Sequence, residues 1–110
     1  MRIHLNADKY QELAMRTRSN FDGRDPLVTA ALGLAGEGGE FADMIKKWYD
    51  QGHLLNHAEL ADELGDICWY IALAATAMGY MFSEILAGNI EKLQARYPNG
   101  FEVEKSLNRD

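Results

Sequence analysis

Two long segments with helical periodicity, over residues 26–49 and 56–78, constrain the fold of this chain most strongly. In each segment apolar side chains recur every third or fourth residue, which places them on one face of an α-helix. A helix start precedes each segment, because Asp25 is followed by Pro26 and Asn56 opens a capping box. The sequence therefore predicts two long amphipathic helices.

Two shorter helices are predicted on either side of this pair. The first begins after Asn6 or Asp8 and ends near Thr17, and the last begins within residues 81–83 and ends at Tyr97, before Pro-Asn-Gly. The second and third helices are expected to stop near glycines, at positions 52 and 79. No segment has the alternating pattern of a strand. The predicted fold class is all-α, with four main helices.

The length of 110 residues predicts a single domain over residues 1–110. With 47% hydrophobic and 25% charged residues, the composition is typical of a folded, soluble protein. The last residues, 102–110, are mostly polar, and we expect them to form either a mobile tail or an arm on a partner subunit.

Charge and composition exclude several classes of partner. The net charge is −6 and no Lys/Arg-rich run occurs, which argues against binding to nucleic acid. The longest apolar run, 67–81, is too short to span a bilayer, so no membrane partner is expected. A single cysteine, Cys68, and an N-terminus without an apolar signal region predict a cytoplasmic protein.

Carboxylates occupy an unusual place on the two long helices. At about 100° per residue, Glu37 falls inside the apolar face of its helix and Glu40 lies about 60° away, at the edge of that face. Glu63 and Asp66 repeat this arrangement on the next helix. Two helices thus each carry one acid within the face that should be buried and another acid one turn along.

A metal ion explains these acids better than solvation does. A single acidic pair with this spacing is usually on the surface, where the repulsion is a few tenths of a kcal/mol. Two pairs angled into apolar faces would be costly without a cation. Oxygen donors favour Mg²⁺, with Mn²⁺ as a substitute. A ferritin-like di-iron site would need Glu-x-x-His, and neither acid pair contains histidine.

Magnesium held by carboxylates usually also holds substrate phosphates, so other polar residues are expected to bind a phosphorylated ligand. Asn89, Lys92 and Arg96 share one face of the last predicted helix, and Lys47 lies on the Glu40 side of its own helix. From spacing alone, binding and simple solvation are about equally good interpretations of the three residues on the last helix.

Aromatic residues could hold a nucleobase. Trp48 and Tyr70 lie on the carboxylate-bearing faces and could stack on a base, although core packing is the commoner role, while Trp69 points elsewhere on its helix. Phe21 and its loop are the alternative wall of a pocket. We also expect Gly33, beside the acids, to leave space for phosphate or metal.

The motifs resemble those of the MazG-like family of all-α nucleoside triphosphate pyrophosphohydrolases. EGGE (Glu37 to Glu40) is followed after 22 residues by ELGD (Glu63 to Asp66), and ALGLAGEGGEFADMIKK, ELADELGDICWYIA and NIEKLQARYPNGF extend the similarity over most of residues 30–101. The resemblance implies a four-helix bundle module, assembled as a homodimer or a dimer of dimers, with these four acids as catalytic metal ligands. Many relatives carry glutamate at the position of Gly36 here, so this chain lacks that carboxylate.

The resemblance also implies an activity. Water activated by Mg²⁺ would attack the α-phosphorus of an NTP or dNTP and release pyrophosphate and the monophosphate. Asn89 and Lys92 match the family's N-x-x-K, which favours a phosphate or sugar role, and Arg96 follows in RYPNGF. Two alternatives are a narrower dUTP or dCTP pyrophosphatase and a catalytically weak helical module that binds nucleotide or protein.

Overall fold

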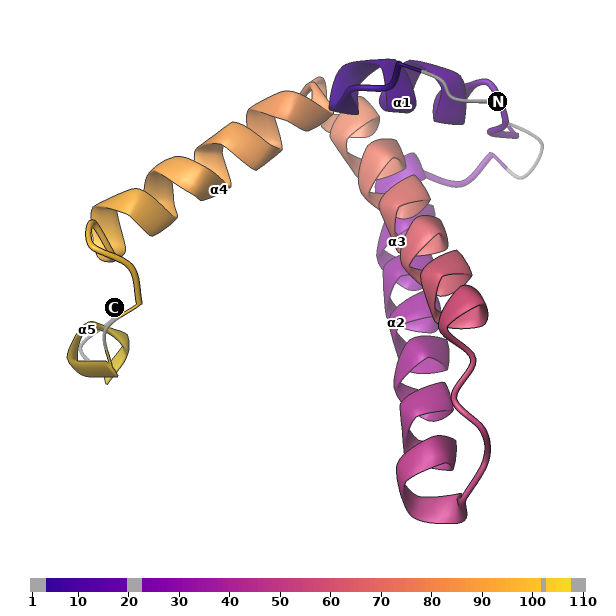
Figure 1. Cartoon of the computed structure of the whole chain (residues 1–110). Coiled ribbons are helices and arrows are strands. Elements are labelled where there is room, and N and C mark those ends of the chain that lie inside the picture. The colour runs from indigo at the N-terminus through magenta and orange to yellow at the C-terminus, as the bar shows by residue number, and fades with distance from the viewer. Residues whose placement is uncertain (1–3, 20–22, 102, 108–110) are drawn as a thin grey trace.

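The computed structural model describes residues 4–19, 23–101 and 103–107. Every regular element in these ranges is a helix, and no strand occurs there, so the all-α prediction is confirmed (Figure 1). The helices are α1 (Ala7–Met15), α2 (Pro26–Gln51), α3 (His57–Met78), α4 (Phe82–Arg96) and α5 (Val103–Leu107).

The helix ends follow the capping residues that the sequence contains. Asn6, Asp25 and Asn56 each accept a hydrogen bond from a backbone N–H two or three residues along the chain, over 2.8 to 3.2 Å. Gly52 and Gly79 adopt left-handed conformations, with φ of 71° and 79°, directly after α2 and α3. The predicted starts and ends of the two long helices are therefore confirmed.

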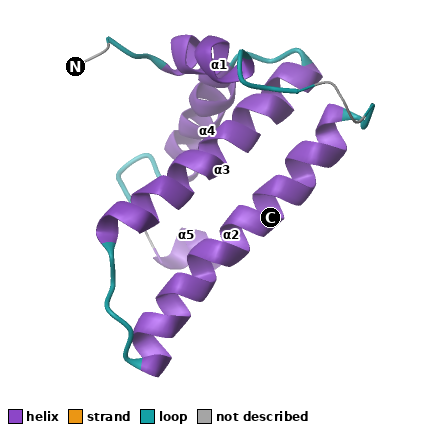
Figure 2. Ribbon diagram, turned by 90° about the vertical axis from the view of Figure 1, so that its right-hand side faces the viewer, coloured by secondary structure: helices purple, strands orange, loops and turns teal. Residues whose placement is uncertain are grey.

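Helices α2 and α3 form an antiparallel hairpin, which is the longest part of the molecule (Figure 2). Small side chains are fully buried on both helices: Ala30 on α2, and Ala72 and Ala75 on α3. Ala72 packs in the core cluster with Ala14 and Phe82, on the side of α1 and α4. The hairpin brings the carboxylate-bearing faces of α2 and α3 together, and it is the scaffold of the site described below.

Helix α1 lies across the end of α3, where the chain turns into α4 (Figure 1). Gln11 is the buried polar residue of this corner: its Nε2 donates to Thr76 Oγ1 and to the Tyr80 carbonyl, both at 3.0 Å. Its Oε1 accepts from the Phe82 backbone N–H at 2.8 Å. One side chain of α1 thus joins the last turn of α3 to the first residue of α4.

Asp8 adds a second connection between α1 and α4. Its carboxylate accepts hydrogen bonds from the backbone N–H of Ser83, at 2.9 Å, and from the Ser83 hydroxyl, at 2.7 Å. These N-terminal groups of α4 have no partner within their own helix, so the carboxylate caps the helix from a distant part of the sequence. The direction of α4 is therefore fixed by α1.

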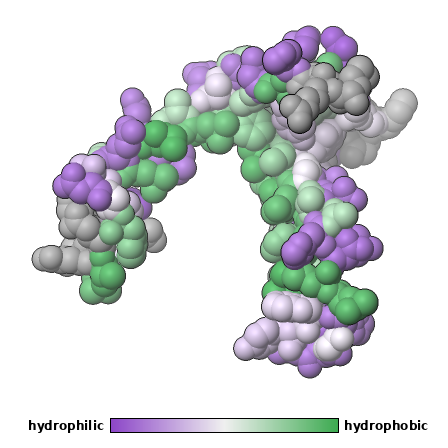
Figure 3. Space-filling model, viewed as in Figure 1, coloured by the Kyte–Doolittle hydropathy of each residue, from purple (hydrophilic) through white to green (hydrophobic). Residues whose placement is uncertain are grey.

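Helix α4 leaves this corner at a steep angle, and the four main helices of one chain do not form a bundle (Figure 1). Leu86, Ile90 and Leu93 on α4 remain 48%, 52% and 39% exposed. Hydrophobic side chains follow the inner side of the arch that α4 makes with the α2–α3 hairpin (Figure 3). The bundle expected from the sequence is therefore not closed within a single chain.

Within the described ranges, no single helix is long and apolar enough to cross a membrane. Helices α3 and α4 meet the criteria of length and composition only when taken together, and they are bent by 100° relative to each other.

The expected C-terminal tail contains a short helix, α5. Its first and last residues, Val103 and Leu107, are exposed. The remainder of the expected tail, at positions 102 and 108–110, lies outside the described residues.

Candidate metal centre and adjoining cavities

Three of the four predicted acids come together between α2 and α3. Carboxylate oxygens of Glu37, Glu63 and Asp66 all lie within 4.8 Å of one another. Glu40 lies one turn further along α2, and its charge acts on Glu63. The convergence follows from the hairpin, because acids on the facing sides of two antiparallel helices meet at the same level.

The cluster contains carboxylate oxygens without partners. Oε2 of Glu37 and Oε2 of Glu63 are both shielded from solvent, and neither has a hydrogen-bond partner among the described residues. The pKa of Glu63 is raised from 4.5 to about 7, first by a hydrogen bond shared with Glu37, then by desolvation, and then by the charges of Glu37 and Glu40. Buried anionic oxygens in this position favour a bound cation.

The donor set fits a hard divalent ion. All three clustered side chains offer carboxylate oxygen, and no histidine or cysteine belongs to this group within the described ranges. Oxygen-only ligation with acidic residues suits Mg²⁺ or Mn²⁺. The arrangement can therefore hold a cation and, through it, the phosphates of a ligand.

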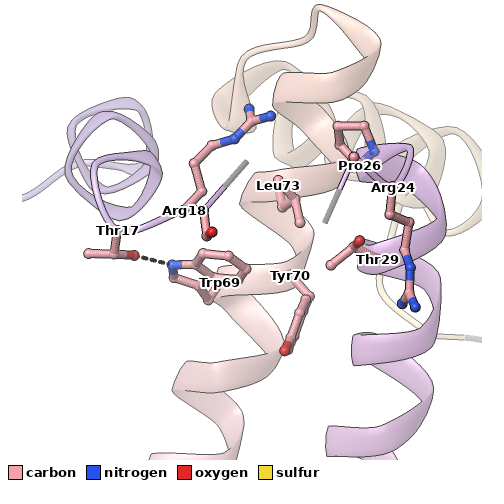
Figure 4. Close-up of a pocket in the computed structure, with 10 residues that line it drawn as sticks. Thr17, Arg18, Arg24, Pro26, Thr29, Trp69, Tyr70 and Leu73 are labelled. Carbon is pink, nitrogen blue, oxygen red and sulfur yellow. Dashed lines mark hydrogen bonds between the residues drawn. The ribbon is translucent and has the colours of Figure 1, made fainter. Parts of the chain in front are cut away.

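A cavity of about 400 Å³ opens beside the carboxylates and is lined by Thr17, Glu37, Asp66, Trp69 and Tyr70. A second cavity, of about 450 Å³, shares three of these residues (Figure 4). It is lined by Thr17, Arg18, Ser19, Gly23, Arg24, Pro26, Thr29, Trp69, Tyr70 and Leu73. We call the first the carboxylate cavity and the second the aromatic cavity. The two cavities adjoin at Thr17, Trp69 and Tyr70, which line both.

Trp69 is a site residue that the sequence analysis placed elsewhere on its helix. It lines both cavities, and its indole Nε1 donates to the Thr17 hydroxyl at 2.7 Å (Figure 4). Its spacing of three residues from Asp66 was the signal that could have found it, because residues three apart lie on neighbouring parts of a helix face. No spacing in the sequence indicates Thr17 as a site residue, because only the tertiary fold places it next to Trp69.

Gly33 has a different role from the expected one, which was to leave space for phosphate or metal. A Cβ built at Gly33 would overlap the ring of Tyr70, so the glycine accommodates Tyr70 against α2. Two further glycines of α2, Gly38 and Gly39, make no such close contact, because a Cβ at either position meets no neighbouring atom of the described structure within 4 Å.

Two predicted binding residues on α2 lie outside both cavities. The Lys47 ammonium pairs with Asp43 at 2.9 Å, a contact that lowers the pKa of Asp43. Trp48 is exposed, and its ring packs edge-on against Tyr49. Of the predicted aromatic residues, Tyr70 alone among those described lines the site. The alternative residue Phe21 lies outside the described residues.

Asn89, Lys92 and Arg96 are carried away from the acids of their own chain by α4 (Figure 1). None of them lines the carboxylate cavity or the aromatic cavity, and the Arg96 guanidinium lies 6.0 Å from the centre of the Tyr97 ring. Within one chain, the structure therefore does not join the two halves of the predicted site.

The fold and the site define a class of all-helical proteins in which an antiparallel helix pair presents clustered carboxylates suited to a divalent ion. Residues 27–101 match the MazG nucleotide pyrophosphohydrolase domain, so the chain belongs to this family. The gene 37 protein of Mycobacterium phage L5 is 32% identical over an alignment of 105 residues, and the match covers 87% of this chain and 92% of the phage protein. No solved structure matches the chain.

Proposed function

We propose that the protein is a Mg²⁺-dependent nucleoside triphosphate pyrophosphohydrolase that converts an NTP or dNTP and water to the monophosphate and pyrophosphate. The main support is the convergence of Glu37, Glu63 and Asp66, with two buried carboxylate oxygens that have no partner in the described structure. The match to the MazG nucleotide pyrophosphohydrolase domain supports the type of bond that we propose is cleaved.

The four acids have different proposed roles, which follow from their positions. Glu37, Glu63 and Asp66 would hold the ion, which, when bound, neutralises phosphate charge and lowers the pKa of a coordinated water. Glu40 is exposed and lies outside the three-carboxylate cluster. We therefore assign it the role of general base, which accepts a proton from the attacking water. The oxygen of that water bonds to the α-phosphorus, while the bond from this phosphorus to the pyrophosphate oxygen breaks.

A second copy of the chain would complete the site. Because α4 diverges from the α2–α3 hairpin, Asn89, Lys92 and Arg96 reach a substrate at the acids only if the α4 comes from a partner subunit. The exposed apolar residues of α4 support such packing. We therefore propose a homodimer or a dimer of dimers, in which Asn89 and Lys92 contact the phosphates or sugar.

The activity is tested by incubating the protein with all eight common NTPs and dNTPs and Mg²⁺, and separating the products. We expect pyrophosphate and the monophosphate from the wild type, and no turnover from Glu63→Gln. Glu59→Gln is the matched control, since it removes an exposed acid of α3 that lies outside the cluster. Release of orthophosphate would contradict the proposed bond cleavage.

The same panel separates the two alternatives. Turnover confined to dUTP or dCTP would identify the narrower pyrophosphatase. Absence of turnover with every nucleotide, together with retained nucleotide binding, would instead favour the catalytically weak binding module.

The shared site is tested by mixing two inactive variants. Glu63→Ala and Lys92→Ala damage opposite halves of the site, so a mixed dimer would contain one intact site, and random exchange should restore about a quarter of wild-type activity. Mixing Glu63→Ala with Glu37→Ala is the control. Both of these acids lie on the hairpin of one chain, so no mixed dimer regains a complete cluster. No recovery in the first mixture would contradict a contribution of α4 from the partner.

A further inference from the structure

We propose that the aromatic cavity receives the nucleoside part of the substrate, and that Thr17 positions Trp69 for this contact. The inference rests on the proposed function, because it places the phosphates of the same substrate in the carboxylate cavity. It assigns a role to the turn that follows α1, a part of the chain that contributes no acid to the cluster.

The lining of the two cavities differs in charge. The carboxylate cavity is bounded by Glu37 and Asp66, so a ligand in it must carry a cation or bind through one. No carboxylate belongs to the described lining of the aromatic cavity, which combines aromatic, apolar and hydroxyl groups with two arginines. Its volume of about 450 Å³ falls within the range of about 300–1,000 Å³ for small-molecule sites.

Two aromatic rings join the cavities. Trp69 and Tyr70 pack edge to face, with ring centres 5.1 Å apart and an angle of 83° between their planes. Figure 4 shows both rings projecting from α3, and Thr29 projecting from α2 toward the same space. A nucleotide with its phosphates at the acids would extend along these rings into the aromatic cavity, where a base can stack on an aromatic face.

Thr17 fixes the first of these rings. Its hydroxyl donates to the Ala14 carbonyl at 2.7 Å and accepts the Trp69 indole N–H at 2.7 Å. The same N–H also approaches the Ala14 carbonyl at 3.2 Å. Because the indole has a single N–H, the orientation of the Trp69 ring follows the last turn of α1. Thr17 is thus a positioning residue that acts through Trp69.

The inference is tested by the fluorescence of Trp69. The chain has two tryptophans, so a Trp48→Phe background leaves Trp69 as the only one. The protein is titrated with the four 2′-deoxynucleoside monophosphates in the presence of Mg²⁺, and with inorganic pyrophosphate as a ligand that lacks a nucleoside. At least one nucleotide should change the Trp69 emission saturably. The pyrophosphate affinity, measured by calorimetry, provides the reference for the carboxylate cavity.

Thr17→Val keeps the shape of the side chain and removes its hydroxyl, whereas Thr17→Ser restores the hydroxyl. The loss of one hydrogen bond should weaken nucleotide binding by about 2- to 12-fold in Thr17→Val. Thr17→Ser should stay within about twofold of the parent on the same scale. In turnover, KM should rise while kcat is retained. The pyrophosphate affinity should be unchanged in both variants.

Three results would overturn the inference: unchanged Trp69 emission with every nucleotide, unchanged nucleotide affinity in Thr17→Val, or equal weakening of nucleotide and pyrophosphate binding. Failure of the proposed function has a different signature. A wild-type protein that binds nucleotide at Trp69 but releases no pyrophosphate from any triphosphate would contradict the activity and leave the nucleoside site supported.

Discussion

Glu63 lies between two other carboxyl groups, and this position has a consequence for the metal-free protein. Its pKa is raised to about 7, mainly by the hydrogen bond with Glu37, then by desolvation and by the neighbouring charges. The folded chain therefore binds a proton near neutral pH that the unfolded chain, with an ordinary value of 4.5, does not bind. Folding of the metal-free protein is coupled to this proton.

The stability of the metal-free protein should fall as pH rises through this range. The stabilising contribution of the Glu63 proton is fully present below pH 4.5 and is lost as pH rises through about 7. Thermal unfolding in EDTA should therefore show a decreasing Tm over this window. Glu63→Gln should have a flatter profile, while Glu59→Gln should follow the wild type. A wild-type Tm that rises through the same window in EDTA would contradict the shared proton.

Gly33 is the second residue whose substitution gives a sharp expectation. Gly33→Ala gains about 1 kcal/mol of helix propensity, but its Cβ would overlap the Tyr70 ring, and overpacking typically costs 1–3 kcal/mol. Gly39→Ala is the matched control on the same helix, where the added Cβ meets open space. We expect Gly33→Ala to unfold at lower urea concentration than the wild type and Gly39→Ala at higher concentration.

The two substitutions also report on assembly. If Gly39→Ala destabilised the protein, a second copy would have to pack against this side of α2. If Gly33→Ala stabilised the protein as much as Gly39→Ala did, the close approach of Tyr70 to α2 would be contradicted.

At the scale of helices, the corner between α1, α3 and α4 depends on Gln11. Gln11→Leu would leave the Tyr80 carbonyl and the Phe82 N–H without their partner from α1, at a cost of roughly 1–3 kcal/mol for each group left unsatisfied. Urea unfolding should detect this loss directly. Glu12→Gln, on the exposed side of α1, removes only surface ion pairs and should change stability by about 0.5 kcal/mol or less. Equal effects would contradict the role of the corner.

The features that could be predicted from the sequence depend on local interactions, and those that could not depend on tertiary contacts. The bounds of α2 and α3 follow from nearby caps such as Asn56 and Gly79, and the convergence of Glu37 and Glu63 follows from helical periodicity. The direction of α4 could not be predicted in this way, because it depends on Gln11, which is 71 residues from Phe82 in the sequence. The role of Trp69 depends in the same way on a distant threonine.

The whole molecule is extended for its length. The radius of gyration is 17.1 Å, against about 13 Å expected for a compact domain of 110 residues. Few hydrophobic side chains are buried: in the described ranges they are Ala14, Ala30, Ala72, Leu73, Ala75 and Phe82. A core of this size is small for the chain, and the exposed face of α4 could complete it in an oligomer.

Ile90→Glu tests this expectation at the level of assembly. A charge on the apolar face of α4 should dissociate the oligomer, since burying an unpaired carboxylate is costly. Sedimentation velocity at micromolar concentration should show a smaller species, and pyrophosphate release should be lost with it. Leu54→Glu is the control, because this leucine is 97% exposed in the loop between α2 and α3. A wild-type protein that sediments as a stable monomer would contradict the oligomer itself.

Helix α1 and the turn after it contact two separate parts of the molecule, Trp69 on α3 and the first residues of α4. Thr17, in the turn that follows α1, holds Trp69 between the two cavities, and Gln11 and Asp8 within α1 set the direction of α4. Under the proposed nucleoside site and the proposed oligomer, ligand preference and subunit geometry would therefore not vary independently. Grafting the first helix of a relative onto this α2–α3 hairpin should change both traits together while leaving the acids in place, so α1 is the natural unit of exchange for altering specificity.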